Sequence, residues 1–284
     1  MRILASTRVV IASLLALGAV ALAPGAFAQD APVQHSEDFA EPPANNDETV
    51  LDVSLGGILS TGNTQSWGLN AGDRFRLVRC SHAFEETFAI AYGQANLPDD
   101  AVDEFKDTVR NINAKLRYDF FLTEMDSLFL AAVYRWDTFA GLDTRLQGQV
   151  GYMRNIFLEE AHRGWAELGY DITYDNYDPD PLPDPANPAG PPLDGDAVVH
   201  SIRGFVGYDN HINENLTYLM GFEGLFNVED AADIRLNWDN ALRTMLVGRL
   251  QMEAKFSLKW DNVPVPGAKP LDTVTQLNLI YSFL

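Results

Sequence analysis

The sequence predicts a closed antiparallel β-barrel of about 12 strands that spans a membrane. Extended segments with period-two alternation follow one another from Thr49 onward. After an N-terminal apolar run, no apolar stretch is long enough for a spanning helix. The chain also ends on an alternating segment with aromatic residues near its tip. Because lipid offers no partner to unpaired backbone groups, a membrane-spanning chain without such helices must close into a barrel.

The first residues, 1–28, have the composition of a secretory signal peptide. Arg2 and Arg8 precede an apolar run that extends to Leu22. The triplet Ala26-Phe27-Ala28 supplies a small-residue cleavage site. We therefore expect this segment to be removed on export and to take no part in the fold.

The rest of the chain divides into a short lead and the barrel. Residues 29–48 are polar and acidic and contain proline, so we expect a disordered periplasmic lead. Residues 49–284 then form the barrel. Together with the export signal, a barrel of this kind predicts a location in the outer membrane of a Gram-negative bacterium.

The alternation is clearest near the end of the chain. Leu250, Met252 and Ala254 share one face of an extended segment, whereas Glu253 and Lys255 share the other. A helix would mix these two sets, and a strand separates them. We expect strands at residues 50–60, 64–79, 83–95, 107–121, 127–138, 144–157, 164–177, 197–210, 215–228, 233–246, 250–262 and 272–284. Their number is even, and each exceeds the roughly 9–11 residues that cross a bilayer at a tilt.

The lengths of the connections predict how the barrel is oriented. With a periplasmic N-terminus, the odd-numbered connections are extracellular and should be the longer set. Asn96–Lys106, Asp178–Asp196 and Asp261–Leu271 agree, since all three are odd-numbered and long. The first connection, Thr61-Gly62-Asn63, is odd-numbered but has the composition of a tight hairpin turn.

The composition excludes some classes of partner and chemistry. The net charge of −20 argues against binding to nucleic acid, which is bound by basic surfaces. Cys80 is the one cysteine, so no internal disulfide can form. The sequence has no phosphate-binding glycine loop and no Cys/His cluster, and we expect no cofactor.

Charged residues of both signs are predicted on the inner face of the barrel. The candidates for the lumen lining are Arg74, Arg76, Arg110, Lys115, Arg117, Arg135, Glu167, Asp171, Arg203, Glu223, Glu253 and Lys255. One interpretation is a charged pore that selects small solutes. The other is a salt-bridged interior that fills a narrow barrel, because 12 strands lie between the filled eight-stranded barrels and the conducting 16-stranded ones.

Two predicted extracellular loops are acidic. Asp99 and Asp100 lie in one, and Asp178 and Asp180 lie in the other. Carboxylates of this kind can bind Ca²⁺ or Mg²⁺, which would bridge the loops to lipopolysaccharide phosphates. A solvated acidic surface without a metal is the alternative, since neither loop has the spacing of a dedicated calcium site.

An outer-membrane hydrolase is a further possibility, because the outer-membrane phospholipase A is also a barrel of 12 strands. Catalysis would need a nucleophile and a base within reach of each other. His200 and Ser201 are adjacent and would face opposite sides of a strand. We therefore expect no catalytic residues.

Two local patterns go beyond the barrel itself. The first is the early turn around Gly62 and Asn63. The second is a late segment with Pro264, Gly267, Asp272 and Thr273, followed by a closing strand with Tyr281 and Phe283. In this order and spacing they resemble the salt-stress-induced, YdiY-like outer-membrane family (domain of unknown function 481), from about residue 50 to the end. The chain departs from the usual ending of such barrels because Leu284 follows the last aromatic residue.

The resemblance implies an outer-membrane protein and brings no catalytic or ligand site. We expect a non-enzymatic barrel that contributes to envelope integrity or stress response, with at most a narrow pore. A porin-like channel for small solutes or ions is the alternative, and an outer-membrane hydrolase is the third possibility. The expected partners are outer-membrane lipid, lipopolysaccharide and, through Tyr281 and Phe283, the barrel-assembly machinery. The sequence leaves the oligomeric state open.

Overall fold

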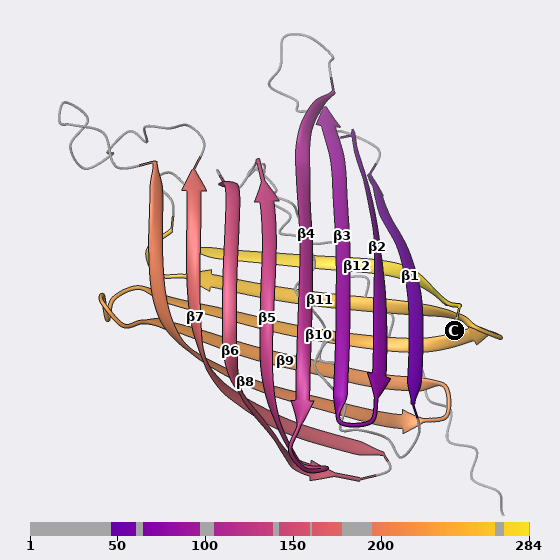
Figure 1. The fold of residues 1–284 in the computed structure, drawn as a ribbon. Coiled ribbons are helices and arrows are strands. Elements are labelled where there is room, and N and C mark those ends of the chain that lie inside the picture. Colours follow the sequence, from indigo (N-terminus) through magenta and orange to yellow (C-terminus); the bar gives the residue numbers. More distant parts are fainter. Residues whose placement is uncertain are drawn as a thin grey trace, which may run out of the picture.

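The computed structural model describes residues 47–60, 65–96, 105–138, 142–159, 161–177, 195–264 and 270–283. These residues form 12 antiparallel strands that close into one barrel between the first strand and the last (Figure 1). The predicted fold class is therefore confirmed. The signal peptide, and all of the acidic lead except its last two residues, lie outside the described residues.

The strands follow the predicted order. Their bounds are β1 (Glu48–Ser60), β2 (Gln65–Arg79), β3 (His82–Asn96), β4 (Lys106–Phe121), β5 (Asp126–Asp137), β6 (Leu142–Leu158), β7 (His162–Tyr177), β8 (Asp196–Asn213), β9 (Leu216–Asn227), β10 (Ile234–Val247), β11 (Leu250–Asp261) and β12 (Leu271–Ser282). The end of β8 differs most from the prediction, because pairing with β9 continues through His211 to Asn213.

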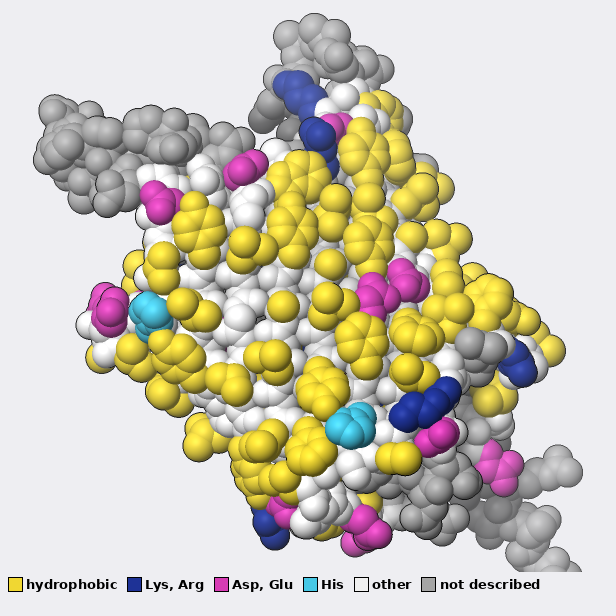
Figure 2. Space-filling view, viewed as in Figure 1, with side chains coloured by type: hydrophobic (Ala, Val, Ile, Leu, Met, Phe, Trp, Pro, Cys, Tyr) yellow, Lys and Arg dark blue, Asp and Glu magenta, His cyan; other side chains and the backbone are white. Residues whose placement is uncertain are grey.

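The wall of the barrel is apolar outside and polar inside. In β4, Lys115, Arg117 and Asp119 are buried, while the intervening Leu116 and Tyr118 are exposed. Figure 2 shows hydrophobic side chains over most of the visible wall. This arrangement is the reverse of a soluble protein and is typical of a barrel that faces lipid. In the described part of the chain, no helix has the length and apolarity needed to cross a membrane.

The two ends of the barrel differ in their connections (Figure 1). At the short-turn end, brief turns join β2 to β3, β4 to β5, β6 to β7, β8 to β9 and β10 to β11. Cys80 and Gly248 adopt positive φ angles of 53° and 58° in two of these turns. The remaining connections between consecutive strands gather at the other end, which we call the long-loop end. Outer-membrane barrels place their longer loops outside the cell, so this end is expected to be extracellular.

The strands are strongly tilted. In Figure 1 the strands β9–β12 of the far wall cross the near strands β2–β7 at a steep angle. Closing a sheet into a barrel requires such a tilt, and the inward side chains of opposite walls then interdigitate. The residues of the candidate site come from both walls.

Candidate functional site

The centre of the lumen holds a chain of alternating charges. Arg117 on β4 donates from Nε and Nη2 to the two carboxylate oxygens of Asp119, at 2.8 Å each. Its Nη1 lies 3.0 Å from Glu167 on β7. Glu167 also accepts from Arg203 on β8 at 2.6 Å, and Arg203 donates to Glu223 on β9 at 2.6 Å. This central network therefore joins four strands through charge-assisted hydrogen bonds.

An apolar layer lies inside the barrel at the short-turn end, on strands β2 to β8. It consists of Val78, Ala83, Phe121, Phe129, Met153, Trp165 and Phe205. Met153 is 0% exposed and Trp165 is 1% exposed. The central network rests on this layer, because the guanidinium carbon of Arg117 lies 4.3 Å from the centroid of the Phe129 ring. Such stacking suits the weakly hydrated guanidinium plane.

A second polar group lies against β12, β1 and β2. Arg243 on β10 donates from Nη2 to Glu253 at 2.8 Å, and Asn278 donates to the same carboxylate at 3.1 Å. Asn70 on β2 donates to Asn278 at 2.9 Å. These side chains border a cavity of about 110 Å³, which Asp52 and further inward residues of β1, β3, β4 and β11 also line.

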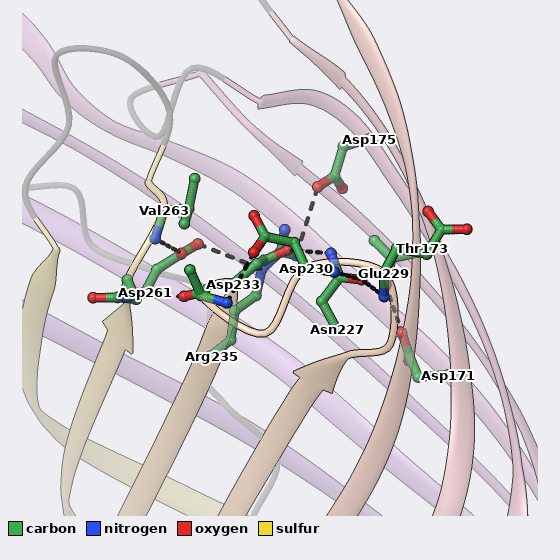
Figure 3. A network of polar contacts seen from close by, with 12 residues as sticks. Asp171, Thr173, Asp175, Asn227, Glu229, Asp230, Asp233, Arg235, Asp261 and Val263 are labelled. Atoms are coloured by element: carbon green, nitrogen blue, oxygen red, sulfur yellow. Dashed lines mark hydrogen bonds and ion pairs between the residues drawn. The ribbon is translucent and has the colours of Figure 1, made fainter.

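A third group of polar contacts lies near the long-loop end (Figure 3). Arg145 donates to both oxygens of Asp175, at 2.6 and 2.7 Å. Arg235 on β10 lies 3.6 Å from Asp175, 3.7 Å from Asp233 and 3.5 Å from Asp261. Arg235 thus connects the two walls of the barrel at this end, since Asp175 lies on β7 and Asp261 on β11.

Together these groups leave little room for water in the described part of the lumen. Arg76 and Lys255 are each 1% exposed, and Arg203 is 2% exposed. The lumen of a wide channel would leave such side chains accessible to solvent. These side chains are therefore closely packed against their neighbours, whereas the side chains of Arg145 and Glu223 stay 17% and 19% exposed.

Most of the predicted lumen residues point inward. They are Arg74, Arg76, Lys115, Arg117, Arg135, Glu167, Asp171, Arg203, Glu223, Glu253 and Lys255. Arg110 lies on the outer face instead. The period of two in β4 places Arg110 with Ile112 and Leu116, and its guanidinium carbon lies 5.0 Å from the ring centroid of Trp136. At the long-loop end, an outward arginine can reach the headgroup region, where aromatic residues also gather.

Several residues of the site were absent from the prediction. They include Asp119, Arg145, Arg163, Asp175, Arg243, Asn278 and the whole apolar layer. Alternation alone could have found Asp119, because it shares its face with Lys115 and Arg117. Alternation does not predict the apolar layer. Its residues are hydrophobic but point inward, where the pattern leads one to expect polar residues.

Other predicted residues fall partly outside the described part of the chain. This holds for Gly62, Asn63, Gly267, Asp99, Asp100, Asp178 and Asp180. Pro264 is the last described residue before one of the gaps, and Asp272 and Thr273 lie at the start of β12. The rings of Tyr281 and Phe283 meet edge to face, with centroids 4.9 Å apart. Among the described residues, no group of three or more His, Cys, Asp or Glu side chains could hold a metal ion.

His200 and Ser201 lie on opposite faces of β8. Ser201 is 4% exposed and points into the barrel. The Nδ1 atom of His200 lies 2.5 Å from the hydroxyl oxygen of Tyr170, on the outer surface. The two side chains are therefore on different sides of the wall.

Comparison with known proteins gives a family and a fold. Residues 53–283 match a family described as "Protein of unknown function, DUF481". No curated protein matches the chain.

Solved structures that are similar include the NanC porin, with 11% identity and a TM-score of 0.47 over 82% of this chain and 99% of that one. The COG4313 outer membrane channel from Pseudomonas putida F1 has 12% identity and a TM-score of 0.46, over 86% of this chain and 98% of that one. The translocator domain of the autotransporter NalP from Neisseria meningitidis has 10% identity and a TM-score of 0.41, over 84% and 88%. These likenesses extend to the architecture of outer-membrane barrels and carry no argument about activity.

Proposed function

The chain belongs to the DUF481 family of unknown function, and from this premise we propose that it is a non-enzymatic outer-membrane barrel with a filled lumen. In this proposal it contributes to envelope integrity or stress response and conducts at most through a narrow path. The observation that carries the proposal is the apolar layer, in which Met153 and Trp165 are almost completely buried. An apolar constriction of this kind excludes water and ions from a lumen.

The ion pairs of the lumen support the same proposal. A selective pore needs charged groups that a passing solute can reach. Here Glu167 is held between Arg117 and Arg203, and the exposed fraction of its side chain is 0%. Charges that neutralise one another across the lumen stabilise the closed wall rather than attract a solute.

A small-solute or ion channel remains the alternative, and the cavity beside Asn70 and Asn278 is the observation that favours it. Its volume of about 110 Å³ would hold several water molecules. Arg74 and Arg243 border this cavity, so it would suit a small ion or polar solute. A conducting path would have to continue past the apolar layer to the short-turn end.

The positions of His200 and Ser201 support the non-enzymatic part of the proposal. A hydrolase, the third possibility, would need a nucleophile and a base within hydrogen-bonding reach. Ser201 points inward and His200 points outward from β8.

Single-channel recording of the refolded protein in a planar bilayer tests the closed lumen. We expect a silent bilayer, with heat-modifiable migration confirming that the barrel has folded. Discrete conductance steps that grow with salt would contradict the filled lumen. A change in ion selectivity in Arg74→Gln would then establish the alternative channel.

The role in the envelope is tested in the native bacterium. We expect deletion of the gene to raise sensitivity to high salt and to detergent, and the wild-type gene to restore resistance. A Ser201→Ala variant should restore resistance equally well, because no catalysis is proposed. Resistance that returns with the wild type but not with folded Ser201→Ala would contradict a non-enzymatic role.

A further inference from the structure

One exposed arginine on the outer face of the barrel differs from the others in having no ionic partner. The exposed arginines of the described residues are Arg79, Arg110, Arg154 and Arg249. The three at the short-turn end donate hydrogen bonds to Thr49, Asp126 and Phe283. Arg110 lies at the long-loop end, and its side chain forms no hydrogen bond or ion pair with another residue that the structure describes. The positive charge of Arg110 is therefore open to a partner from outside the described part of the chain.

The guanidinium group of Arg110 lies on an aromatic surface. Its central carbon is 5.0 Å from the ring centroid of Trp136 on β5. Arg110 also faces Tyr92 across β3 and β4, and the ring of Tyr92 meets that of Trp67 on β2 edge to face, with centroids 5.6 Å apart. Four neighbouring strands thus carry a row of three rings and one guanidinium. A contact with a ring orients the guanidinium but leaves its N–H donors free for hydrogen bonds.

The nearest acidic residue on the same strand is bound to other groups. Asp107 precedes Arg110 on β4. Its Oδ1 atom accepts hydrogen bonds from the hydroxyl group of Tyr92, at 2.7 Å, and from the amide of Gln94, at 2.9 Å, both on β3. These bonds hold the carboxylate toward β3, and it forms no ion pair with Arg110. The negative charge of Asp107 opposes an anion at this place, but it does not occupy the donors of Arg110.

The row of rings lies at the level expected for lipid head groups. Aromatic girdles mark the two boundaries of the apolar band in outer-membrane barrels. Trp67 is close to the start of β2 and Trp136 is close to the end of β5, so both lie near the long-loop end. Toward the middle of the wall, Leu69 and Ile90 are 58% and 42% exposed and offer an apolar surface to acyl chains. Figure 2 shows basic side chains above the hydrophobic surface at the upper end of the wall.

We propose that Arg110, with Trp136 beside it, binds a phosphate group of lipopolysaccharide in the outer leaflet of the membrane. The planar guanidinium can donate two parallel hydrogen bonds to one phosphate, which makes arginine well suited to this ligand. The long-loop end is expected to face the outside of the cell, and lipopolysaccharide forms that leaflet of the outer membrane. The acyl chains of the lipid then lie against Leu69 and Ile90, below the phosphate.

This inference goes beyond the proposed function and does not depend on it. The lipid site is on the outer face of the wall, whereas the apolar layer that opposes conduction lies inside the barrel. Arg110→Gln should therefore leave the planar bilayer silent. A conducting wild type would contradict the closed lumen and leave the lipid site unaffected.

Native mass spectrometry of the folded barrel tests the role of Arg110. The protein is held in micelles of an uncharged detergent, and lipid A is added as the probe. We expect a complex with one lipid A, and Arg110→Gln should lower the bound fraction at least about fivefold. Arg154→Gln is the matched control, because it removes an exposed arginine that is already paired with Asp126 at the other end of the barrel. Equal binding by the two folded variants would overturn the proposal.

Changes of charge test whether the phosphate is the group that is bound. Arg110→Lys should retain only part of the binding, because lysine lacks the paired donors of arginine. Asp107→Asn should raise the bound fraction, since it removes a negative charge beside the site and keeps an oxygen acceptor for Tyr92.

The choice of lipid tests the source of the phosphate. Lipid A without its phosphate groups should bind at least about fivefold less than intact lipid A. Inorganic phosphate at the same concentration should not displace lipid A from the wild type. If lipid A without phosphate or phosphatidylglycerol binds as well as intact lipid A, or if inorganic phosphate displaces it, the assignment to lipopolysaccharide phosphate is wrong.

Discussion

At the scale of single residues, the central network depends on Glu167. This carboxylate is the shared partner of Arg117, at 3.0 Å, and of Arg203, at 2.6 Å. All three side chains are almost completely buried, so neither guanidinium can turn to water. We expect Glu167→Gln to destabilise the folded barrel by roughly 1.5–3 kcal/mol, because it weakens the charge-assisted hydrogen bonds between Glu167 and two buried guanidinium groups, which keep Asp119 and Glu223 as partners. Urea unfolding in micelles, with heat-modifiable migration as the readout, measures the change in the free energy of unfolding.

The exposed pair of Arg154 and Asp126 is the control for this experiment. Its ion pair of 2.8 Å involves an arginine side chain that is 56% exposed. Arg154→Gln should leave the unfolding midpoint unchanged, since exposed ion pairs contribute little. If Arg154→Gln and Glu167→Gln shift the unfolding midpoint equally, burial is not the reason why the central network contributes to stability.

Gly207 on β8 is a second sensitive position. It pairs with Trp165 on β7, whose ring lies over the glycine, and a Cβ atom there would collide with that ring. Because Trp165 is buried in the apolar layer, the ring has little room to move. We expect Gly207→Ala to destabilise the barrel by roughly 1–3 kcal/mol through overpacking.

Gly204 provides a matched control for Gly207→Ala on the same strand. A Cβ atom added to Gly204 would meet nothing within 4 Å. Gly204→Ala should therefore be neutral or slightly stabilising in the same unfolding experiment. If both alanines have the same effect, the contact with Trp165 is not the cause.

At the scale of the strands, the outer face of β2 and β3 carries an acidic pair. Asp73 pairs in register with Val53 and Phe88, near the middle of the wall, and Glu86 of β3 lies near it on the same face. Figure 2 shows acidic side chains within the otherwise apolar surface. Half-buried side chains of this kind are unusual on a lipid-facing wall.

Replacing this pair should stabilise the barrel in a bilayer. We expect Asp73→Val with Glu86→Leu to raise the free energy of unfolding by roughly 1–2 kcal/mol, because carboxyl groups at this depth oppose insertion. Reversible unfolding in phosphatidylcholine vesicles measures the change. Glu124→Leu, in a short turn outside the wall, should have no such effect. A loss of stability in the double variant would indicate that the pair has a structural partner on this face.

The strands also show where sequence reasoning succeeds. Within β11, the alternation of Met252, Ala254 and Phe256 with Glu253 and Lys255 predicts both faces correctly, because it needs only local periodicity. The prediction for Arg110 is wrong, because its position in the alternation of β4, which it shares with Ile112 and Leu116, decides its side of the wall and its charge does not. Charged residues near the ends of strands can face outward, since the headgroup region accepts them.

At the scale of the whole molecule, the partners in the lumen depend on how the sheet closes. Arg117 and Glu167 are 50 residues apart in the chain, and Asn70 and Asn278 are 208 residues apart. Which inward residues meet depends on the tilt and stagger of 12 strands. No single strand contains that information. The sequence therefore predicts the wall and its two faces, whereas the apolar layer and the ion pairs between distant strands depend on how the barrel closes.

Closure also determines where the barrier to conduction lies. The apolar layer brings together inward side chains from β2 to β8, and no other cluster of buried apolar residues occurs in the described lumen. If this layer closes the barrel, removing its two central rings should open a path for ions. We expect Phe129→Ala with Trp165→Ala to give discrete conductance steps in a planar bilayer where the wild type is silent. The variant should also be less stable. Each truncation leaves a cavity and lowers the free energy of unfolding by roughly 3–5 kcal/mol.

The control for this variant is Trp238→Ala, which removes a ring of similar size from the outer face of β10, where Trp238 is 40% exposed. It should remain silent. Heat-modifiable migration must show a folded barrel for each variant, so that leakage through unfolded protein is excluded. A folded but silent double variant would move the barrier to the charged networks, in which case Glu167→Gln, rather than loss of the rings, should produce conductance.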